Sequence, residues 1–506
     1  MKKELEKKTT FLKCLVILVF PVLLCMLYCM VRGTALWRLY LPDFYNNDCL
    51  FYYKIVDGIL SGGIPKGYFG YNESRALIGS FSLWSPTIVM PWVVFGFIFG
   101  WNFSSIFICN IAFISLCLAL FILLTAPEWK NIVCMALGLS LFTSFSLHLL
   151  CGLPEATFLG IVIVFFGLAL KCCRDQAKSS YIWIMMFIGV FLSIARPYMV
   201  MSILLPSWFL YKKEKVKIRA VIISILMMIV ATAAFFAVNH YFCSPYFSSI
   251  FVLRNVFESA VQTLKDIFKF IRDAFAYGLT AGTHYCVAGL SAVLVFIALF
   301  DKKEKKNRPV YVFYIVMTAG ILGAILVFYR QANEGGRHLW FLAVVGCMLC
   351  ALFTNNLRGI ISKATLGALL IVFIARGSLF PTDYDIPIGN DQTKEKVLYW
   401  EKVFDENGIQ ATDELGYDNV VIWTFIDVDN SNTIVMDYKG LYALPKGMGI
   451  SCCMPNYVIE NIDNLKSKYL AADNRGEVAK LCEERRFEKI GEYDNMVLYK
   501  TGSYGD

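Results

Sequence analysis

Apolar residues form long blocks along the first 380 residues of the chain. Each block holds roughly 15–25 residues, and about 20 mostly apolar residues are needed for a helix to cross the hydrocarbon core of a bilayer. Backbone polar groups must be paired within lipid, so these blocks are predicted to be helices. The pattern predicts a polytopic α-helical membrane protein. We expect about 11 spanning helices, over residues 11–31, 103–125, 131–150, 155–171, 181–195, 197–210, 218–239, 285–300, 309–329, 338–353 and 364–380.

Lysine and arginine residues gather in short loops between these blocks, and the positive-inside rule places such loops in the cytoplasm. The N-terminus is then cytoplasmic, and everything after residue 380 is extracytoplasmic. The first apolar run is long and lacks a small-residue cleavage site, so we interpret it as a signal anchor in the plasma membrane. The basic loops are Lys2–Lys8, Lys171–Lys178, Lys212–Arg219, Lys302–Arg308 and Arg358–Lys363.

One more apolar block, 86–101, is short, begins at Pro86 and contains Pro91. All the basic loops can be cytoplasmic only if this block does not cross the membrane. We therefore interpret it as a juxtamembrane or re-entrant helix on the outer side. In the alternative, 86–101 spans the membrane and 181–210 forms one helix with Arg196 buried in its middle, which is the more costly arrangement.

Composition narrows the class of protein further. A chain with 58% hydrophobic and 17% charged residues is not a soluble globular domain. The net charge of +8 is accounted for by the orienting loops, so we expect no nucleic-acid partner. The 17 cysteines lie mostly within apolar runs, where cysteine behaves as a small hydrophobe, and their spacing predicts neither a disulfide framework nor a zinc site.

Three segments on the predicted outer side are long: 32–102, 240–284 and 381–506. In the second, apolar residues at helical spacing opposite a charged face predict an amphipathic helix on the membrane surface. The third is charged and turn-rich, and we expect a small α/β domain there, following a transmembrane domain over 1–380. Strands are expected at Val420–Trp423, Thr433–Met436 and Met496–Tyr499, and helices at 393–406, 461–471 and 475–486.

The first outer loop carries the most polar stretch of the N-terminal half. Asp48 lies just before an apolar run, where a carboxylate can act as a general base or simply cap a helix, and the residues alone favour capping. Glu73 is either a second acidic ligand or a surface turn residue. Tyr52 and Tyr53 suit sugar stacking as well as an interfacial belt. Lys66, near the glycines of this loop, is a weaker binding candidate.

Other candidates lie where helices begin or break. Glu155 opens a predicted spanning helix after a proline, where it either complements the helix dipole or faces a cavity, and we favour a functional role. Arg196 interrupts an apolar run together with Tyr198 nearby, and a buried arginine needs a phosphate or carboxylate partner. Arg337 and His338 open a further helix and are either phosphate ligands or part of a solvated turn.

These features resemble the GT-C superfamily of polyprenyl-phosphate-sugar-dependent glycosyltransferases, which includes protein O-mannosyltransferases and lipid A aminoarabinose transferases. The resemblance rests on Asn47-Asp48 with Tyr52-Tyr53, the proline-containing block 86–100, the Gly152–Glu155 stretch, the Arg196-Pro197 break and the C-terminal α/β segment. Many members have a second acid directly after the first, whereas Cys49 follows Asp48 here. This departure leaves open whether Glu73 takes over and whether a divalent cation takes part.

The resemblance implies a membrane enzyme whose donor is a sugar on polyprenyl phosphate and whose acceptor is a glycan, lipid or protein. Asp48 would be the general base of an inverting transfer, and Arg196, Arg337 and His338 would stabilise the phosphate leaving group. Glu155 and Glu73 would orient the acceptor or hold a cation, and no cofactor is firmly implied. Two alternatives remain: an O-antigen-type polymerase or ligase, and a lipid-linked saccharide flippase or transporter.

Overall fold

The computed structural model divides into two compact units. A helical unit comprises Met1–Leu36, Phe107–Phe235 and Phe251–Asp385, and an α/β unit comprises Trp37–Ile106, Phe236–Ile250 and Ile386–Asp506. The first outer loop is therefore grouped with the C-terminal segment. The residues that the structure describes are 2–41, 46–62, 69–75, 86–174, 178–242, 260–274, 278–300, 304–325, 332–353, 357–373, 391–412, 416–429 and 432–501.

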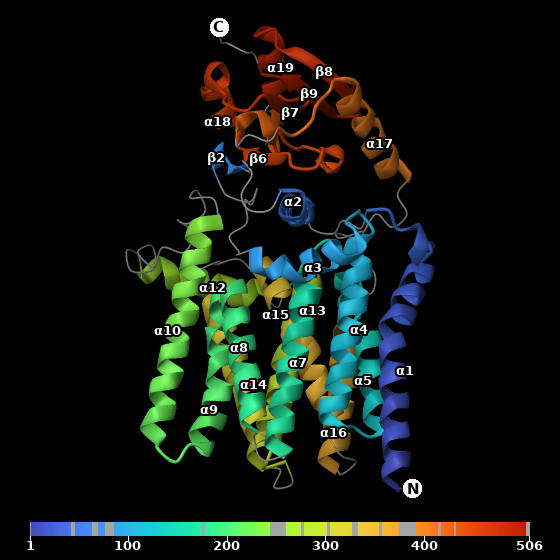
Figure 1. The fold of residues 1–506 in the computed structure, drawn as a ribbon, viewed down its shortest axis with the longest axis vertical. Helices are drawn as coiled ribbons and strands as arrows, with labels where there is room; N and C mark the ends of the chain where they lie inside the picture. The colour runs from blue at the N-terminus through green and yellow to red at the C-terminus, as the bar shows by residue number, and fades with distance from the viewer. Residues whose placement is uncertain are drawn as a thin grey trace. The chain divides into compact units, whose positions relative to one another are not determined.

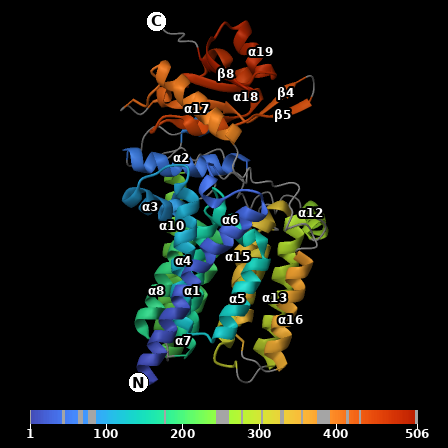
Figure 2. The ribbon, with the colours of Figure 1, turned by 90° about the vertical axis from the view of Figure 1, so that its right-hand side faces the viewer.

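The helical unit is a bundle whose long helices run side by side, as Figures 1 and 2 show. All of the predicted apolar blocks between residues 11 and 373 lie in helical segments of the described residues. The segments are α1 (Lys2–Val31), α4 (Ser105–Thr125), α5 (Trp129–Leu141), α6 (Thr143–Leu150), α7 (Glu155–Arg174), α8 (Ser179–Ala195), the 3-10 helix η3 (Pro197–Ile203), α9 (Leu204–Lys213), α10 (Lys217–Phe242), α12 (Ala260–Ala274), α13 (Gly278–Phe300), α14 (Arg308–Ala324), α15 (Ala332–Ala351) and α16 (Leu357–Phe373).

Length and composition confirm an α-helical membrane protein. Among the described residues, five helices are long and apolar enough to cross a membrane. They are Lys8–Val31, Ser105–Thr125, Glu155–Arg174, Lys217–Phe242 and Gly282–Phe300. Four of the other predicted spans correspond to shorter apolar helices, the block 131–150 corresponds to a bent helix pair, and the block 197–210 corresponds to η3 and α9. The number of about 11 crossings stays a prediction.

The block predicted as one helix over 131–150 is bent. Helices Trp129–Leu141 and Ser144–Leu150 meet at 75°, so this block is a bent pair of helices rather than one continuous helix, and its crossing of the membrane stays a prediction. The break falls at Phe142, which has non-helical backbone angles and is fully buried.

Residues 181–210 do not form one helix. Helix α8 ends at Ala195, and Pro197 opens η3, since proline cannot continue a helix but fits its first position. The chain then folds back along α8, as the hydrogen bond from the hydroxyl of Ser202 to the carbonyl of Gly189 shows, at 3.3 Å. The alternative that fused 181–210 into one span is therefore wrong.

The block 86–101 is also short in the structure. It forms a 3-10 turn, η2 (Pro86–Val89), and α3 (Met90–Phe99). A helix of 10 residues is about 15 Å long, half the thickness of the hydrocarbon core. This length favours the juxtamembrane or re-entrant interpretation, which stays a prediction.

Basic residues from several loops gather at one end of the helical unit. The ammonium of Lys13 donates to the carbonyl of Pro127 at 2.7 Å, in the turn between α4 and α5. Arg174 at the end of α7 donates to Thr125, and Lys363 of α16 donates to Asn131 at 3.4 Å. A shared basic end is what the positive-inside rule requires, and the orientation of that end in a membrane stays a prediction.

The described residues of the α/β unit form a seven-stranded sheet, in the order β2-β1-β6-β3-β7-β9-β8. Strands β1, β6, β3 and β7 are parallel, and β9 and β8 continue the sheet antiparallel. The strands are β1 (Phe69–Tyr71), β2 (Ser74–Arg75), β3 (Val420–Thr424), β6 (Gly449–Cys453), β7 (Tyr469–Asp473), β8 (Glu488–Tyr493) and β9 (Met496–Lys500), with a separate hairpin of β4 (Ile426–Asp429) and β5 (Asn432–Val435).

Helices α17 (Asp391–Glu406), α18 (Pro455–Glu460) and α19 (Glu477–Glu484) flank this sheet, with η7 (Tyr417–Asn419), η8 (Lys439–Ala443) and η9 (Ile462–Asn464) in its connections. The three predicted strands and the helices near 393–406 and 475–486 are confirmed. The helix predicted over 461–471 is wrong, because Tyr469 opens strand β7, whose five residues are all buried in the middle of the sheet. Uniform burial gives a continuous apolar run that resembles a helix in sequence.

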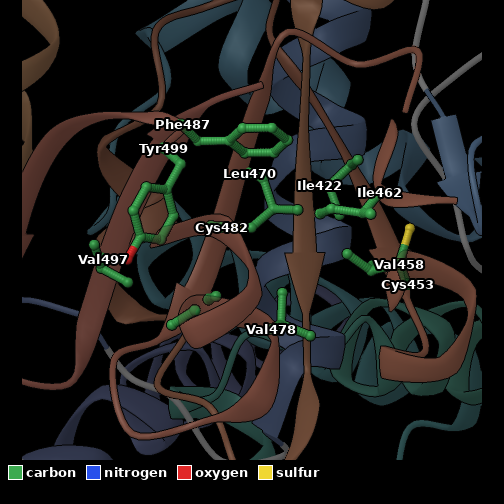
Figure 3. Close-up of a cluster of buried hydrophobic side chains, with 12 residues drawn as sticks. Ile422, Cys453, Val458, Ile462, Leu470, Val478, Cys482, Phe487, Val497 and Tyr499 are labelled. Carbon is green, nitrogen blue, oxygen red and sulfur yellow. The ribbon is translucent and has the colours of Figure 1, made fainter. Parts of the chain in front are cut away.

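One core of this unit lies between the sheet and two helices, as Figure 3 shows. Ile422, Leu470 and Val497 project from three neighbouring strands. Val478 of α19 and Val458 of α18 pack against them. This core fixes the strands to which the first outer loop is added.

Two short strands of the first outer loop, β1 and β2, were not predicted. Strand β1 pairs in parallel with β6, with Tyr71 opposite Cys452. The turn between β1 and β2 places Asn72 and Glu73 at positive φ angles of 43° and 50°. Such angles are typical of a two-residue hairpin turn, and asparagine tolerates them well. The loop is thereby built into the C-terminal sheet.

Candidate functional site

The helical unit contains a buried ion pair between Glu155 and Arg196. Glu155 is the first residue of α7, and Arg196 follows the last residue of α8. The guanidinium Nη2 donates to Glu155 Oε1 at 2.7 Å, and the two side chains are 1% and 3% exposed. A buried charge without a partner would strongly destabilise the unit, so Glu155 and Arg196 each neutralise the charge of the other.

Arg196 owes its position to the break in the α8–η3 segment. Its backbone is extended, with φ −145° and ψ 118°, and its N–H still donates to the carbonyl of Leu192 at 2.8 Å. Pro197 then starts η3, which turns the chain and brings Tyr198 back beside Arg196. The aromatic ring of Phe158 lies 5.1 Å from the guanidinium carbon and adds a cation–π contact.

His338 of α15 joins this pair. Its Nδ1 lies 2.5 Å from Arg196 Nη1 and 3.0 Å from the hydroxyl of Tyr198. Arg196 Nη1 also donates to the Tyr198 hydroxyl at 2.8 Å. A guanidinium can only donate, so Nδ1 must be an acceptor and the ring must be neutral with its proton on Nε2. Glu155, Arg196, Tyr198 and His338 are called the buried tetrad below.

The next turns of α7 and α15 support the tetrad with aromatic packing. Phe158 and Phe341 meet edge to face with ring centroids 5.3 Å apart. Trp340 stacks on His148 of α6 at 4.2 Å, and His148 Nδ1 lies 2.8 Å from the carbonyl of Ser144. Three of the chain's four histidines, His148, His284 and His338, are buried rather than exposed at a surface.

Asp48 belongs to the α/β unit. It lies in the first turn of α2 (Asn46–Gly62), where a carboxylate complements the helix dipole, and its side chain is half-buried. Burial raises the pKa of the Cys452 thiol, and the charges of Cys453 and Asp48 act in the same direction, which places Asp48 near strand β6. The geometry is compatible with capping and with a base, so the catalytic role stays a prediction.

Helix α2 is anchored by Lys54, a residue that the sequence analysis missed. Its ammonium lies 3.1 Å from Asp57 Oδ2 and 3.0 Å from the carbonyl of Leu444, and both side chains are buried. These contacts of Lys54 hold α2, the helix that carries Asp48, against the segment after η8. The signal in the sequence was a Lys and an Asp three residues apart within an apolar run.

Glu73 is held by four hydrogen bonds. Its Oε1 accepts from the backbone N–H of Lys466 at 3.0 Å, and from the N–H and hydroxyl of Ser467, each at 2.7 Å. Its Oε2 accepts from the Tyr457 hydroxyl at 3.0 Å. Burial and this carboxylate raise the pKa of Tyr457. A buried carboxylate with this many donors is suited to holding the β1–β2 turn in place rather than to exchanging protons.

Tyr52 and Tyr53 are buried, with 4% and 7% exposure. The ring of Tyr53 lies 5.4 Å from Trp101, in a stacked arrangement, and 5.6 Å from Tyr442. This packing favours a core role over the predicted sugar contact. Lys66 lies outside the described residues, as does the side chain of Arg337.

The structure thus brings four of the predicted residues into one tetrad in the helical unit. It places Asp48, Glu73, Tyr52 and Tyr53 in the α/β unit. Within the part of the chain that the structure describes, no three His, Cys, Asp or Glu side chains are grouped so as to hold a metal ion.

Comparison with known proteins identifies the fold. No family model matches the chain, and no curated protein matches it in sequence. The structure is similar to ArnT from Cupriavidus metallidurans bound to undecaprenyl phosphate, with a TM-score of 0.53 and 10% identity over 97% of this chain and 98% of that one.

Two further matches have lower scores. The oligosaccharyltransferase of Archaeoglobus fulgidus, in complex with zinc and sulfate, has a TM-score of 0.48 and 12% identity over 96% of this chain and 73% of that one. Apo ArnT from Cupriavidus metallidurans gives 0.42 and 10% identity over 97% and 98%. The ArnT match at 0.53 extends over nearly the whole of both chains, and we conclude that this protein has a GT-C-like fold.

Proposed function

We propose that the protein is an integral membrane glycosyltransferase that moves a sugar from a polyprenyl-phosphate donor to a cell-envelope acceptor on the outer face of the membrane. The observation that carries this proposal is the fold shared with an ArnT structure that holds undecaprenyl phosphate, over nearly the full length of both chains. Apolar helices long enough to span a bilayer give such a donor a route of access from lipid.

The buried tetrad supports a role at the phosphate end of the donor. Arg196 keeps His338 neutral with Nδ1 as acceptor, which leaves Nε2–H as the donor of the ring. A donor hydrogen bond of this kind stabilises a phosphate oxygen as negative charge develops on the leaving group. Arg337, one residue before His338, is proposed as a second phosphate ligand.

Asp48 is proposed as the general base. Its carboxylate would take the proton of an acceptor hydroxyl while that oxygen attacks the anomeric carbon and the phosphate departs, with inversion. The contacts of the remaining acids favour other roles. Glu155 neutralises and orients Arg196, and Glu73 holds the β1–β2 turn, so we propose both as positioning residues.

A donor panel tests this function. Purified protein in lipid nanodiscs is given polyprenyl-phosphate monosaccharides with a mixture of envelope acceptors, and free polyprenyl phosphate is measured by mass spectrometry. Release of free lipid phosphate that depends on the acceptor supports the proposal.

Two results would contradict it. Turnover only with oligosaccharides on polyprenyl diphosphate would identify a polymerase or ligase. Movement of the donor between leaflets without release of lipid phosphate would identify a flippase.

A further inference from the structure

Helix α12 connects two membrane-spanning candidates, α10 and α13. It lies across the axes of the bundle helices in both views of the fold (Figures 1 and 2). Consecutive spans must be joined at a membrane surface, so a helix in this connection lies at the level of the lipid headgroups or beyond them. Its neighbours in the bundle are α13 and α15.

One face of α12 is apolar and uncovered. Leu264, Phe268 and Ile271 are 57%, 71% and 48% exposed. Their spacing of four and three residues places them in a single stripe along the helix. Ile267, which borders the stripe, is half-buried. Three large apolar side chains exposed in one line are costly in water, and an apolar surface is needed to cover them.

The charged residues of α12 are distributed unevenly around this stripe. Lys265, Lys269 and Arg272 each follow a stripe residue by one position, so all three cations border the same edge of the stripe. Asp266 and Asp273 each follow by two positions and lie on the opposite side of the helix. Asp266 accepts from Gln262 at 2.8 Å, and Asp273 pairs with Arg272 at 2.8 Å in an exposed contact.

We infer that α12 lies in the membrane interface, with its apolar stripe at the acyl boundary and its cationic edge on anionic phospholipid headgroups. The segregation of cations to the border of the stripe, and of acids to the far side, is the complementarity that an anionic lipid surface requires. A neutral lipid surface would not require that segregation. The inference does not depend on the proposed glycosyltransferase activity.

Hydrogen–deuterium exchange of the full-length protein tests this inference. The protein is placed in nanodiscs of phosphatidylcholine alone, or of phosphatidylcholine mixed with phosphatidylglycerol, and exchange is followed in peptides that cover 260–274. Each cation near an anionic surface shifts such an equilibrium about fivefold. We expect exchange of α12 to slow by an order of magnitude or more in the anionic nanodiscs, and high salt should remove the difference.

Charge variants on the same helix separate the alternatives. Lys265→Gln, Lys269→Gln and Arg272→Gln combined should abolish the lipid difference, whereas Asp266→Asn with Asp273→Asn should preserve it. Equal exchange in both nanodiscs would overturn the inference. So would a lipid difference that survives loss of all three cations.

Discussion

Replacement of Glu73 distinguishes a positioning residue from a catalytic one. Glu73→Ala removes the acceptor of three donors, on Lys466 and Ser467, and of the Tyr457 hydroxyl. Each buried donor left without a partner costs about 1–3 kcal/mol, and these costs are not fully additive. We expect the free energy of unfolding of the α/β unit to fall by about 3–5 kcal/mol.

Glu73→Gln is the informative comparison. Its amide oxygen can keep the three donors that reach Oε1, and its NH₂ can donate to the Tyr457 hydroxyl, so chiefly the charge is lost. We expect a cost of about 1–2 kcal/mol. A unit of this size shifts its melting temperature by about 2–4 °C for each kcal/mol. The alanine variant should then melt on the order of 10 °C lower, and the glutamine variant a few degrees lower.

The assay is thermal unfolding in detergent followed by tryptophan fluorescence, since Trp423 and Trp400 are buried in this unit. Glu406→Ala is the matched control, because Glu406 is 61% exposed and forms an exposed ion pair with Lys402 at 3.5 Å, a contact that contributes little to stability. Turnover is measured beside stability. A Glu73→Gln protein that melts like wild type but has lost all turnover would refute the positioning role and restore a catalytic one.

Three further changes test the remaining contacts. Glu155→Ala should destabilise the helical unit by about 3–5 kcal/mol, because Arg196 would stay buried without its carboxylate. Replacing both Glu155 and Arg196 by glutamine should recover most of that loss. Thermal aggregation in detergent measures both variants. Lys54→Met should destabilise the α/β unit by a similar amount, since Asp57 would stay buried without a cation, and tryptophan fluorescence melts would show it. The raised pKa of Tyr457 predicts stability that is complete below about pH 10, where tyrosine in the unfolded chain begins to ionise, and that falls as the pH rises further. Tyr457→Phe should reduce this alkaline loss in pH-dependent melts without removing it, because burial also raises the pKa of Tyr499 in the same unit.

The helical part of the fold was predictable because each helix in lipid must satisfy its own backbone. Apolar blocks therefore mark helices directly, and the Arg196-Pro197 step marked a break because proline cannot continue a helix. The bend at Phe142 was not predictable, because no proline lies within 131–150 to mark a break in the helix.

The α/β unit was harder to predict, because its sheet joins distant segments. Strand β1 pairs with β6 through Tyr71 and Cys452, which are 381 residues apart in the sequence. No local sequence pattern around Tyr71 predicts so distant a partner. The central strand that begins at Tyr469 is buried on both faces, so its sequence lacks the alternation that identifies a strand.

The candidate site shows the same limit. The sequence identified the four residues of the buried tetrad because polar groups are rare in apolar runs. Only the structure shows that Arg196 hydrogen-bonds to the other three. Lys54 was missed because its partners include carbonyls about 390 residues away. Each of these pairings depends on tertiary contacts that residue type and spacing do not contain.

The most direct test of the proposed chemistry is turnover by Asp48→Asn. Asparagine keeps the size and shape of the side chain in the first turn of α2 and loses only its charge on the helix dipole, about 0.3–1 kcal/mol, whereas its amide cannot accept the proton of an acceptor hydroxyl. Release of free polyprenyl phosphate from the preferred donor should fall by about 100-fold or more with a nearly unchanged melting temperature. Wild-type turnover by the folded Asp48→Asn protein would contradict Asp48 as the general base.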